Sequence, residues 1–244
     1  MQASESLTPP SFMERYAHAE RLLVALDCIV FGFDGESLKL LLIKRKFEPE
    51  KGNWSLMGGF VERNEGLEEA ANRILFELTG LRDIYFEQLQ TFGDVNRDPV
   101  ERTISVALFA LINIHAHDQD AARAQNAYWI NLDRRPDLIF DHSKMVDLAL
   151  EKLRYKAAVH PIGFELLPEK FTIPQLQKLY EEIYNEPLDR RNFSRKILST
   201  RLLIDTGEKN EKSATKKAVL YKLDQEKYHK QFNSFHHFIS PGKG

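Results

Sequence analysis

A cluster of cationic side chains near the C-terminus has the clearest chemical meaning in this sequence. Between Asp189 and Lys222 there are ten Lys and Arg residues against four Asp and Glu, a local net charge of +6, whereas the whole chain has a net charge of −2. Lys and Arg bind phosphate groups, and such contacts with a polyanion weaken as salt rises. A basic segment on an otherwise acidic chain therefore predicts a polyanionic partner for that segment alone.

The basic residues follow the pattern of two helices and a hairpin. Thr172 and Gln175 fit the capping box of a first helix, in which apolar residues recur at helical spacing through Ile183. After a short turn, Asp189 can cap a second helix that runs to about Thr200. Strands are expected at 202–205 and 218–223, with a basic loop at 206–217 between them. This order of elements is typical of a winged helix-turn-helix.

A winged helix-turn-helix binds DNA by placing its second helix in the major groove and its hairpin beside the backbone. The second helix here has an apolar inner face and a basic outer face. Its candidate DNA contacts are Arg190, Arg191, Asn192, Ser194, Arg195 and Lys196, and those of the hairpin are Lys209, Lys212, Lys216 and Lys217. A merely solvated basic surface, or a helix that docks on a membrane or a protein, leaves the lysine-rich hairpin unexplained.

The residues before this unit alternate between strand and helix patterns. Strands are expected at 22–33, 38–44, 84–92, 103–114 and 128–132, helices at 67–78 and 144–158, and a glycine-containing loop at 54–59. The length of 244 residues suffices for two domains. We divide the chain into a flexible N-terminus (1–21), a first domain (22–158), a DNA-binding domain (159–230) and a C-terminal tail (231–244).

The first domain contains a long motif that resembles the Nudix box. Its members here are Gly59, Glu65, Arg73, Glu77, Gly80 and Leu81, at the spacing of that box. The resemblance implies an α+β fold with an α/β/α sandwich, followed by the winged helix. It also implies an ion pair between Glu65 and Arg73 that holds the loop to the helix. Glu69 and Arg73, four residues apart, are a second candidate pair.

The box lacks two of the three glutamates that hold divalent metal ions in Nudix hydrolases. Ile74 and Leu78 occupy their positions, and only Glu77 remains. Aliphatic side chains cannot bind Mg²⁺, which requires oxygen ligands. We therefore expect no metal site, no cofactor and no catalytic residues. The alternative is a shifted site that combines Glu77 with other carboxylates, namely Glu62, Glu65, Glu68 and Glu69.

A metal-poor Nudix fold joined to a winged helix resembles the Nudix-related transcriptional regulators of bacteria, over about residues 22–223. Residues 171–177 and 188–196 look like the two DNA-domain helices of that family. The resemblance implies a homodimer that binds operator DNA and responds to a small molecule in the Nudix domain. One branch of the family senses ADP-ribose and controls NAD metabolism. Another, from Bacteroides-like bacteria, senses arabinose and controls sugar use.

The effector is the least determined part of this prediction. ADP-ribose requires positive charge near its diphosphate, which Lys44, Arg45, Arg63 and Arg97 could supply. A pentose requires carboxylates, amides and an aromatic face. The candidate effector contacts are Lys44, Trp54, Glu62, Asp94, Asn96 and Asp98. Because residues 54–60 and 139–142 look closer to the sugar-responsive branch, we expect a pentose, with ADP-ribose as the alternative.

The remaining composition points to the cytoplasm. Cys28 is the single cysteine and lies in an apolar run, so we expect a buried thiol and a reducing compartment. Residues 1–13 lack the features of a signal peptide, and no apolar run has membrane-spanning length. Two other functions stay open: an active ADP-ribose hydrolase with an accessory nucleic-acid domain, and a scaffold whose two units bind only protein.

Overall fold

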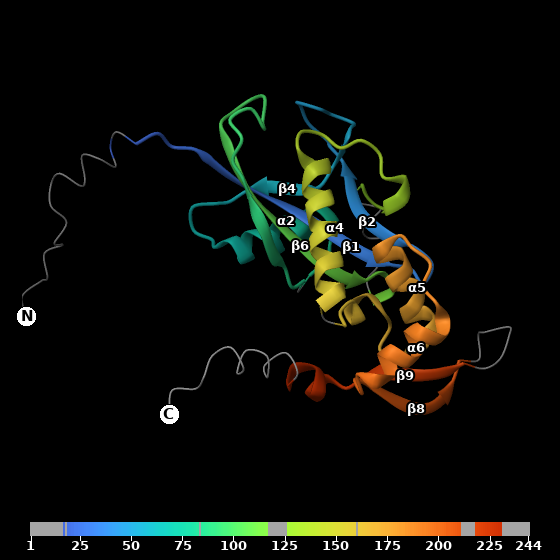
Figure 1. Ribbon diagram of the computed structural model, residues 1–244. Coiled ribbons are helices and arrows are strands. Elements are labelled where there is room, and N and C mark those ends of the chain that lie inside the picture. The colour runs from blue at the N-terminus through green and yellow to red at the C-terminus, as the bar shows by residue number, and fades with distance from the viewer. Residues whose placement is uncertain are drawn as a thin grey trace, which may run out of the picture.

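A computed structural model describes residues 17, 19–82, 84–116, 126–159, 161–210 and 218–230. The first domain is a seven-stranded sheet between two helices (Figure 1). Its strands are β1 (Leu23–Phe33), β2 (Leu38–Lys44), β3 (Trp54–Ser55), β4 (Met57–Phe60), β5 (Glu87–Phe92), β6 (Thr103–Asn113) and β7 (Ala127–Asn131). Its helices are α2 (Leu67–Thr79) and α4 (His142–Val159), with short 3-10 turns η1 (Ile114–Ala116) and η2 (Leu132–Arg134).

The central strand β1 shows why the domain forms a sandwich. Side chains alternate between the two faces of a strand, and β1 is apolar on both faces over most of its length. Leu26, Cys28 and Val30 pack in one core with α2, and Ile29 and Phe31 pack in the other with α4. The parallel pairing of β1 with β6 buries both strands, as expected for the middle of a covered sheet. The predicted α/β/α sandwich and the buried Cys28 thiol are confirmed.

The second domain has the predicted winged-helix order. It consists of η3 (Phe164–Leu166), α5 (Ile173–Tyr184), α6 (Arg190–Ser199), β8 (Leu203–Lys209) and β9 (Val219–Leu223). Thr172 and Gln175 form the predicted capping box, and Asp189 caps α6 by accepting a hydrogen bond of 2.7 Å from the Asn192 amide. β8 and β9 form the antiparallel hairpin of the wing. Backbone hydrogen bonds between Phe171 and Tyr221 tie the hairpin to the start of α5.

Three local predictions are wrong. Residues 54–59 form strands rather than a loop, because Trp54 and Ser55 pair with β2 and residues 57–60 pair with β1. β8 continues to Lys209, well beyond the predicted end. Glu69 accepts a hydrogen bond from the Gly66 amide as part of a capping box and does not pair with Arg73. None of the helices in the described segments has the length and apolar character needed to cross a bilayer.

One hydrophobic core extends through both domains. It contains Phe31 and Leu40 of the sheet, Leu153 of α4, and Leu179 and Ile183 of α5. Hydrogen bonds cross the same boundary, since the Leu38 amide donates to Glu182 over 3.2 Å and the Arg154 side chain donates to the Ile183 carbonyl over 2.7 Å. Figure 1 shows α5 beside the lower part of α4, with α6 and the wing beyond it. The winged helix is therefore packed firmly against the first domain.

Candidate functional site

In the structure, the residues of the Nudix box hold a loop onto the helix α2. The Arg73 guanidinium donates to Glu65 over 2.9 Å from Nε and to the Phe60 carbonyl over 3.0 Å. Glu65 also accepts from the Glu62 amide, and these bonds, the one from Arg73 first, lower the pKa of Glu65 to about 2. The predicted Glu65–Arg73 ion pair is confirmed. Both charges are used to shape the loop, which leaves neither free to bind a metal or a ligand.

The residues at the metal-binding positions of the box do not fit a divalent cation. Ile74 is 2% exposed and packs against Gly59, where an added Cβ would lie 3.0 Å from its side chain. Leu78 lines the nearby cavity, and Glu77 is solvent-exposed with an ion pair of 3.5 Å to Arg73. Across the described residues, no group of three or more His, Cys, Asp and Glu side chains is placed to hold a metal ion. Two of the three box positions thus offer no oxygen atom to a divalent cation.

A cavity of about 250 Å³ lies above this helix, at the end of the sheet where α4 begins. Three consecutive cations line one side of it, namely Lys44, Arg45 and Lys46. Its apolar lining includes Leu78 and three phenylalanines, Phe47, Phe60 and Phe140. The Arg45 guanidinium lies 4.1 Å above the ring of Phe47, so charge and aromatic surface alternate there. Such a lining suits an anion that also carries a flat ring.

The floor of the cavity is a buried network of charges. The alternation along β1 places Asp27 on the α4 face, where its Oδ2 atom accepts from Ser105 over 2.6 Å and from Arg97 over 3.3 Å. Arg97 also makes two hydrogen bonds of 2.8 and 3.0 Å to Asp141. Burial alone would lower the pKa of Arg97, but the two carboxylates raise it. The network therefore keeps its charges paired inside the protein.

His142, the first residue of α4, completes this floor. Its Nδ1 atom accepts a hydrogen bond of 3.2 Å from the Leu56 amide, so the proton is on Nε2, 3.3 Å from Oδ1 of Asp27. The side chain is almost completely buried, and burial lowers the pKa of His142 below its ordinary 6.5. The imidazole is thus neutral at pH 7 and lies against the Asp27 carboxylate. Gly58 is needed beside it, because a Cβ there would lie 2.5 Å from Oδ1 of Asp27.

The predicted effector residues are divided among different places. Lys44 and Asp98 line the cavity, as do Arg45 and Arg97, whereas Arg63 does not. Asp94 and Asn96 line a neighbouring hollow of about 630 Å³ that shares Arg97 and Phe140 with the cavity.

Several of these residues have structural roles. Asp94 and Asp98 each accept a backbone hydrogen bond within their own turn. Trp54 does not line the cavity. Its ring packs edge-on against Tyr128 and has the Lys44 ammonium above it. Glu62 lies 3.9 Å from Arg73 in the box loop.

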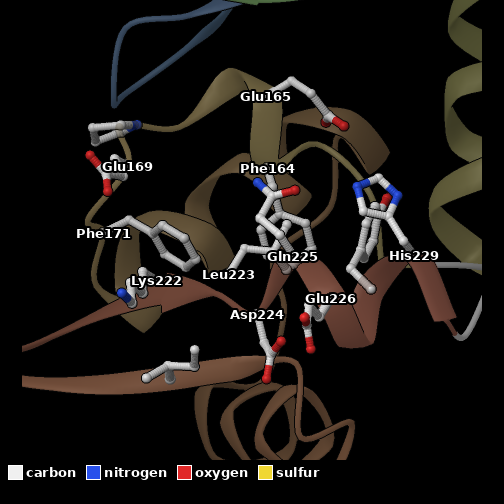
Figure 2. Close-up of a pocket in the computed structure, with 13 residues that line it drawn as sticks. Phe164, Glu165, Glu169, Phe171, Lys222, Leu223, Asp224, Gln225, Glu226 and His229 are labelled. Carbon is white, nitrogen blue, oxygen red and sulfur yellow. The ribbon is translucent and has the colours of Figure 1, made fainter.

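A larger cavity of about 530 Å³ lies in the winged-helix domain, between η3 and the end of the wing. Figure 2 shows Phe164, Phe171 and Leu223 along it, together with several acidic side chains. The carboxylates are those of Glu165, Glu169, Asp224 and Glu226. Because these four carboxylates outnumber the one lysine of the lining, Lys222, the cavity does not suit a diphosphate or DNA.

The outer face of α6 is a cationic surface. Arg190, Arg191, Asn192, Arg195 and Lys196 are exposed on it, and Ser194 is half-buried. Among the described residues, none of these cations forms an ion pair, although Arg195 donates to the Asn192 side chain over 3.0 Å. The inner face packs through Ile197 and through Phe193, whose ring lies 5.5 Å from that of Tyr180.

The wing is described only in part. Lys209 is exposed at the end of β8, and Lys212, Lys216 and Lys217 lie outside the described residues.

Sequence reasoning missed Asp27, Asp141 and His142 as parts of the site. One signal was present, since Asp27 is the only charged residue within the apolar run of β1. A carboxylate buried at such a position must have a partner. The identity of the partners depends on how the loop of Arg97 and the start of α4 meet β1, which the local sequence does not encode.

Comparison with known families identifies the type of each of the two domains. Residues 21–148 match the NUDIX domain family, and residues 163–223 match the NrtR DNA-binding winged helix domain. The chain is thus a Nudix domain joined to a DNA-binding type of winged helix.

Full-length relatives identify the family. The chain is 32% identical over 210 residues to the "ADPR responsive transcriptional repressor NtrR" of Acinetobacter baylyi, which covers 84% of each protein. It is also 32% identical to Shewanella oneidensis NrtR in a crystal structure with a 27mer DNA, with a TM-score of 0.73 over 84% of this chain and 95% of that one. The chain belongs to the NrtR family.

Two further matches cover a smaller part of the chain. The NUDIX domain of Shewanella oneidensis NrtR, solved in complex with ADP ribose, is 30% identical, with a TM-score of 0.52 over 60% of this chain and 99% of that one. An "ADP-ribose pyrophosphatase" of Methanocaldococcus jannaschii is 40% identical over 123 residues, half of this chain and 70% of the relative.

Proposed function

We propose that this protein is a DNA-binding transcriptional regulator whose operator affinity is controlled by ADP-ribose bound in a Nudix domain without hydrolase activity. The observation that carries the proposal is the cavity lined by Lys44, Arg45 and Lys46 beside the aliphatic residues Ile74 and Leu78. The cations can neutralise a diphosphate, and the phenylalanines offer stacking surface for adenine. The absence of carboxylates at two box positions favours retention of the ligand over its cleavage.

ADP-ribose replaces the pentose as the favoured effector. The comparisons favour it, since two relatives are named for their response to ADP-ribose or were solved with it bound. They offer no support for an arabinose-responsive branch. The structure adds that Trp54 and Glu62, two of the residues expected to bind a sugar, lie outside the cavity.

Operator DNA is the proposed partner of α6. Its cations are exposed, and among the described residues no carboxylate forms an ion pair with them. Residues that bind phosphate need to be accessible in this way. A second copy of the chain would present two such helices to a pseudo-palindromic site. Exposed apolar side chains at adjoining strand ends support this homodimer, because Leu23, Val24 and Phe60 are each 39–53% exposed. Soluble monomers rarely leave such patches uncovered.

A thermal-shift experiment tests the effector. ADP-ribose and L-arabinose are each added to the purified protein, with and without Mg²⁺, because a ligand of the folded state raises the melting temperature by mass action. We expect a rise with ADP-ribose that does not depend on Mg²⁺, and none with L-arabinose. A shift with the sugar alone would reverse the assignment.

The DNA and dimer assignments need separate measurements. Duplexes selected by the protein from a random-sequence pool should show a recurrent inverted repeat, and their affinity should fall as salt rises. Light scattering should give a particle of twice the chain mass. A protein that selects no DNA sequence would favour the scaffold function instead.

A further inference from the structure

The helix α4 has one end in the effector cavity and the other against the DNA-binding domain. Its 18 residues span about 27 Å at 1.5 Å per residue. Met145, Val146, Ala149 and Leu153 bury its inner face in the shared core. A helix packed in this way moves as a rigid element rather than bending. A displacement at one end is therefore carried to the other.

The first end of α4 is held by residues that a ligand must approach. His142 lies in the lining of the cavity, accepts a hydrogen bond from the Leu56 amide, and has Nε2 3.3 Å from Oδ1 of Asp27. Asp141, one residue earlier, holds the guanidinium of Arg97, which also lines the cavity. An anion bound there competes with Asp141 and Asp27 for Arg97. Occupancy of the cavity thus acts on the two residues that fix the start of α4.

The last turns of α4 are bonded to the end of α5. Arg154 is half-buried, and its Nε atom donates to the Ile183 carbonyl over 2.7 Å, while the Tyr184 hydroxyl donates to the Arg154 carbonyl over 3.3 Å. A second attachment lies on the sheet, where the Leu38 amide donates to Glu182. α5 is therefore held at neighbouring points by α4 and by β2. A shift of α4 relative to the sheet must turn α5.

The position of α6 follows that of α5. Glu181 accepts from the Leu188 amide over 3.1 Å, and Gln177 donates to the Leu188 carbonyl over 2.9 Å, so the turn before α6 is fixed to α5. Ring packing between Tyr180 and Phe193 fixes the helix itself. These contacts leave α6 no independent freedom to reorient while α5 stays in place.

We propose that α4 transmits the occupancy of the cavity to α6. The transmission depends on the two hydrogen bonds between α4 and α5, chiefly that from Arg154 to the Ile183 carbonyl. This regulatory role rests on the proposed function, since it requires that ADP-ribose alters DNA binding. Arg154 lies on α4, outside the cavity lining and outside α6, and acts by positioning α5. Loss of these hydrogen bonds uncouples the two binding sites while leaving each of them intact.

The test is a binding cycle with Arg154→Met, which keeps the aliphatic stem and removes the donor. Affinity for a duplex selected by the wild-type protein is measured with and without saturating ADP-ribose, and affinity for ADP-ribose is measured without DNA. In the wild type we expect ADP-ribose to change the DNA affinity by about tenfold or more. In the variant that change should shrink to less than about twofold, with both separate affinities within about threefold of wild type.

Two companion variants keep the outcome interpretable. Tyr184→Phe removes only the hydrogen bond from the Tyr184 hydroxyl to the Arg154 carbonyl and should reduce the coupling in part. It provides a test even if Arg154→Met does not fold. Lys152→Met is the matched control, because Lys152 is on the same helix but bonds to Gln88 within the sensor domain. It should keep the wild-type coupling. Full coupling in both Arg154→Met and Tyr184→Phe would overturn the inference, whereas absent coupling in the wild type would overturn the proposed function as well.

Discussion

The Nε2 atom of His142 lies 3.3 Å from Oδ1 of Asp27, with both side chains almost completely buried. Burial keeps His142 neutral at pH 7 despite the carboxylates of Asp27 and Asp141, and Arg97 and Arg45 act in the same direction as burial. The pKa of His142 is thus lower in the folded protein than in the unfolded chain. As pH falls below the ordinary value of 6.5, the unfolded chain takes up this proton first and the folded state loses stability.

This linkage predicts a specific pH profile. The free energy of unfolding, measured by denaturant titration, should be constant above about pH 7 and decline between pH 6.5 and 5. His142→Gln should remove most of that decline, while His115→Gln, at an exposed site, should keep it. An unchanged profile in His142→Gln would show that another group is responsible.

Removal of Arg97 should strongly destabilise the protein. Its side chain is 4% exposed and is shared by Asp27 and Asp141, so Arg97→Met leaves two carboxylates without their cation. Breaking a buried ion pair from one side costs about 3–5 kcal/mol. Denaturant titration measures this directly. A loss of under about 1 kcal/mol, the range of surface ion pairs, would mean that water reaches the network.

Gly58→Ala should disturb the cavity floor through a single methyl group. The added Cβ would lie 2.5 Å from Oδ1 of Asp27, which must move away from His142. We expect a lower melting temperature and a weaker response to ADP-ribose in the thermal-shift experiment. Gly93→Ala is the matched control, since no atom lies within 4 Å of its added Cβ. Equal effects of the two substitutions would contradict the close approach.

Arg195→Ala should weaken DNA binding and reduce its salt dependence. Loss of one phosphate contact lowers the slope of log affinity against log salt by about 1. The ADP-ribose affinity should stay the same, because α6 lies outside the cavity. Lys51→Ala, an exposed cation of the sensor domain, is the control and should leave the slope unchanged. If Arg195→Ala lost both activities, the two sites would not be separate.

The wild-type protein should leave ADP-ribose intact in the presence of Mg²⁺. Ile74 and Leu78 provide no ligand atoms, and Glu77 is directed to Arg73. Product analysis by chromatography after prolonged incubation should show no AMP above the protein-free control. Mg²⁺-dependent AMP release that disappears in Glu77→Gln would restore the hydrolase function.

Much of the fold could be predicted because local signals agree with it. The helix starts at Thr172 and Asp189 and the continuous apolar run of β1 each specify an element through neighbouring residues. The prediction of a loop at residues 54–59 was wrong because the strands there depend on partners far away in the chain, in β1 and β2. The same limit applies to the site. The spacing of the Nudix box pointed to Leu78 and the box loop. The contacts among Asp27, Arg97 and His142 instead result from tertiary packing of three segments that are distant in the chain.

The hydrophobic core that runs from the sheet through α4 into α5 has an evolutionary consequence. A winged helix cut away near residue 162 would expose Leu176, Leu179 and Ile183 to water, and the severed sensor would expose the matching surface of α4. Each half should therefore be less stable alone than within the whole chain. The chain should melt in one cooperative transition, and a recombination event that gave this winged helix a new sensor would have to bring its supporting helix along.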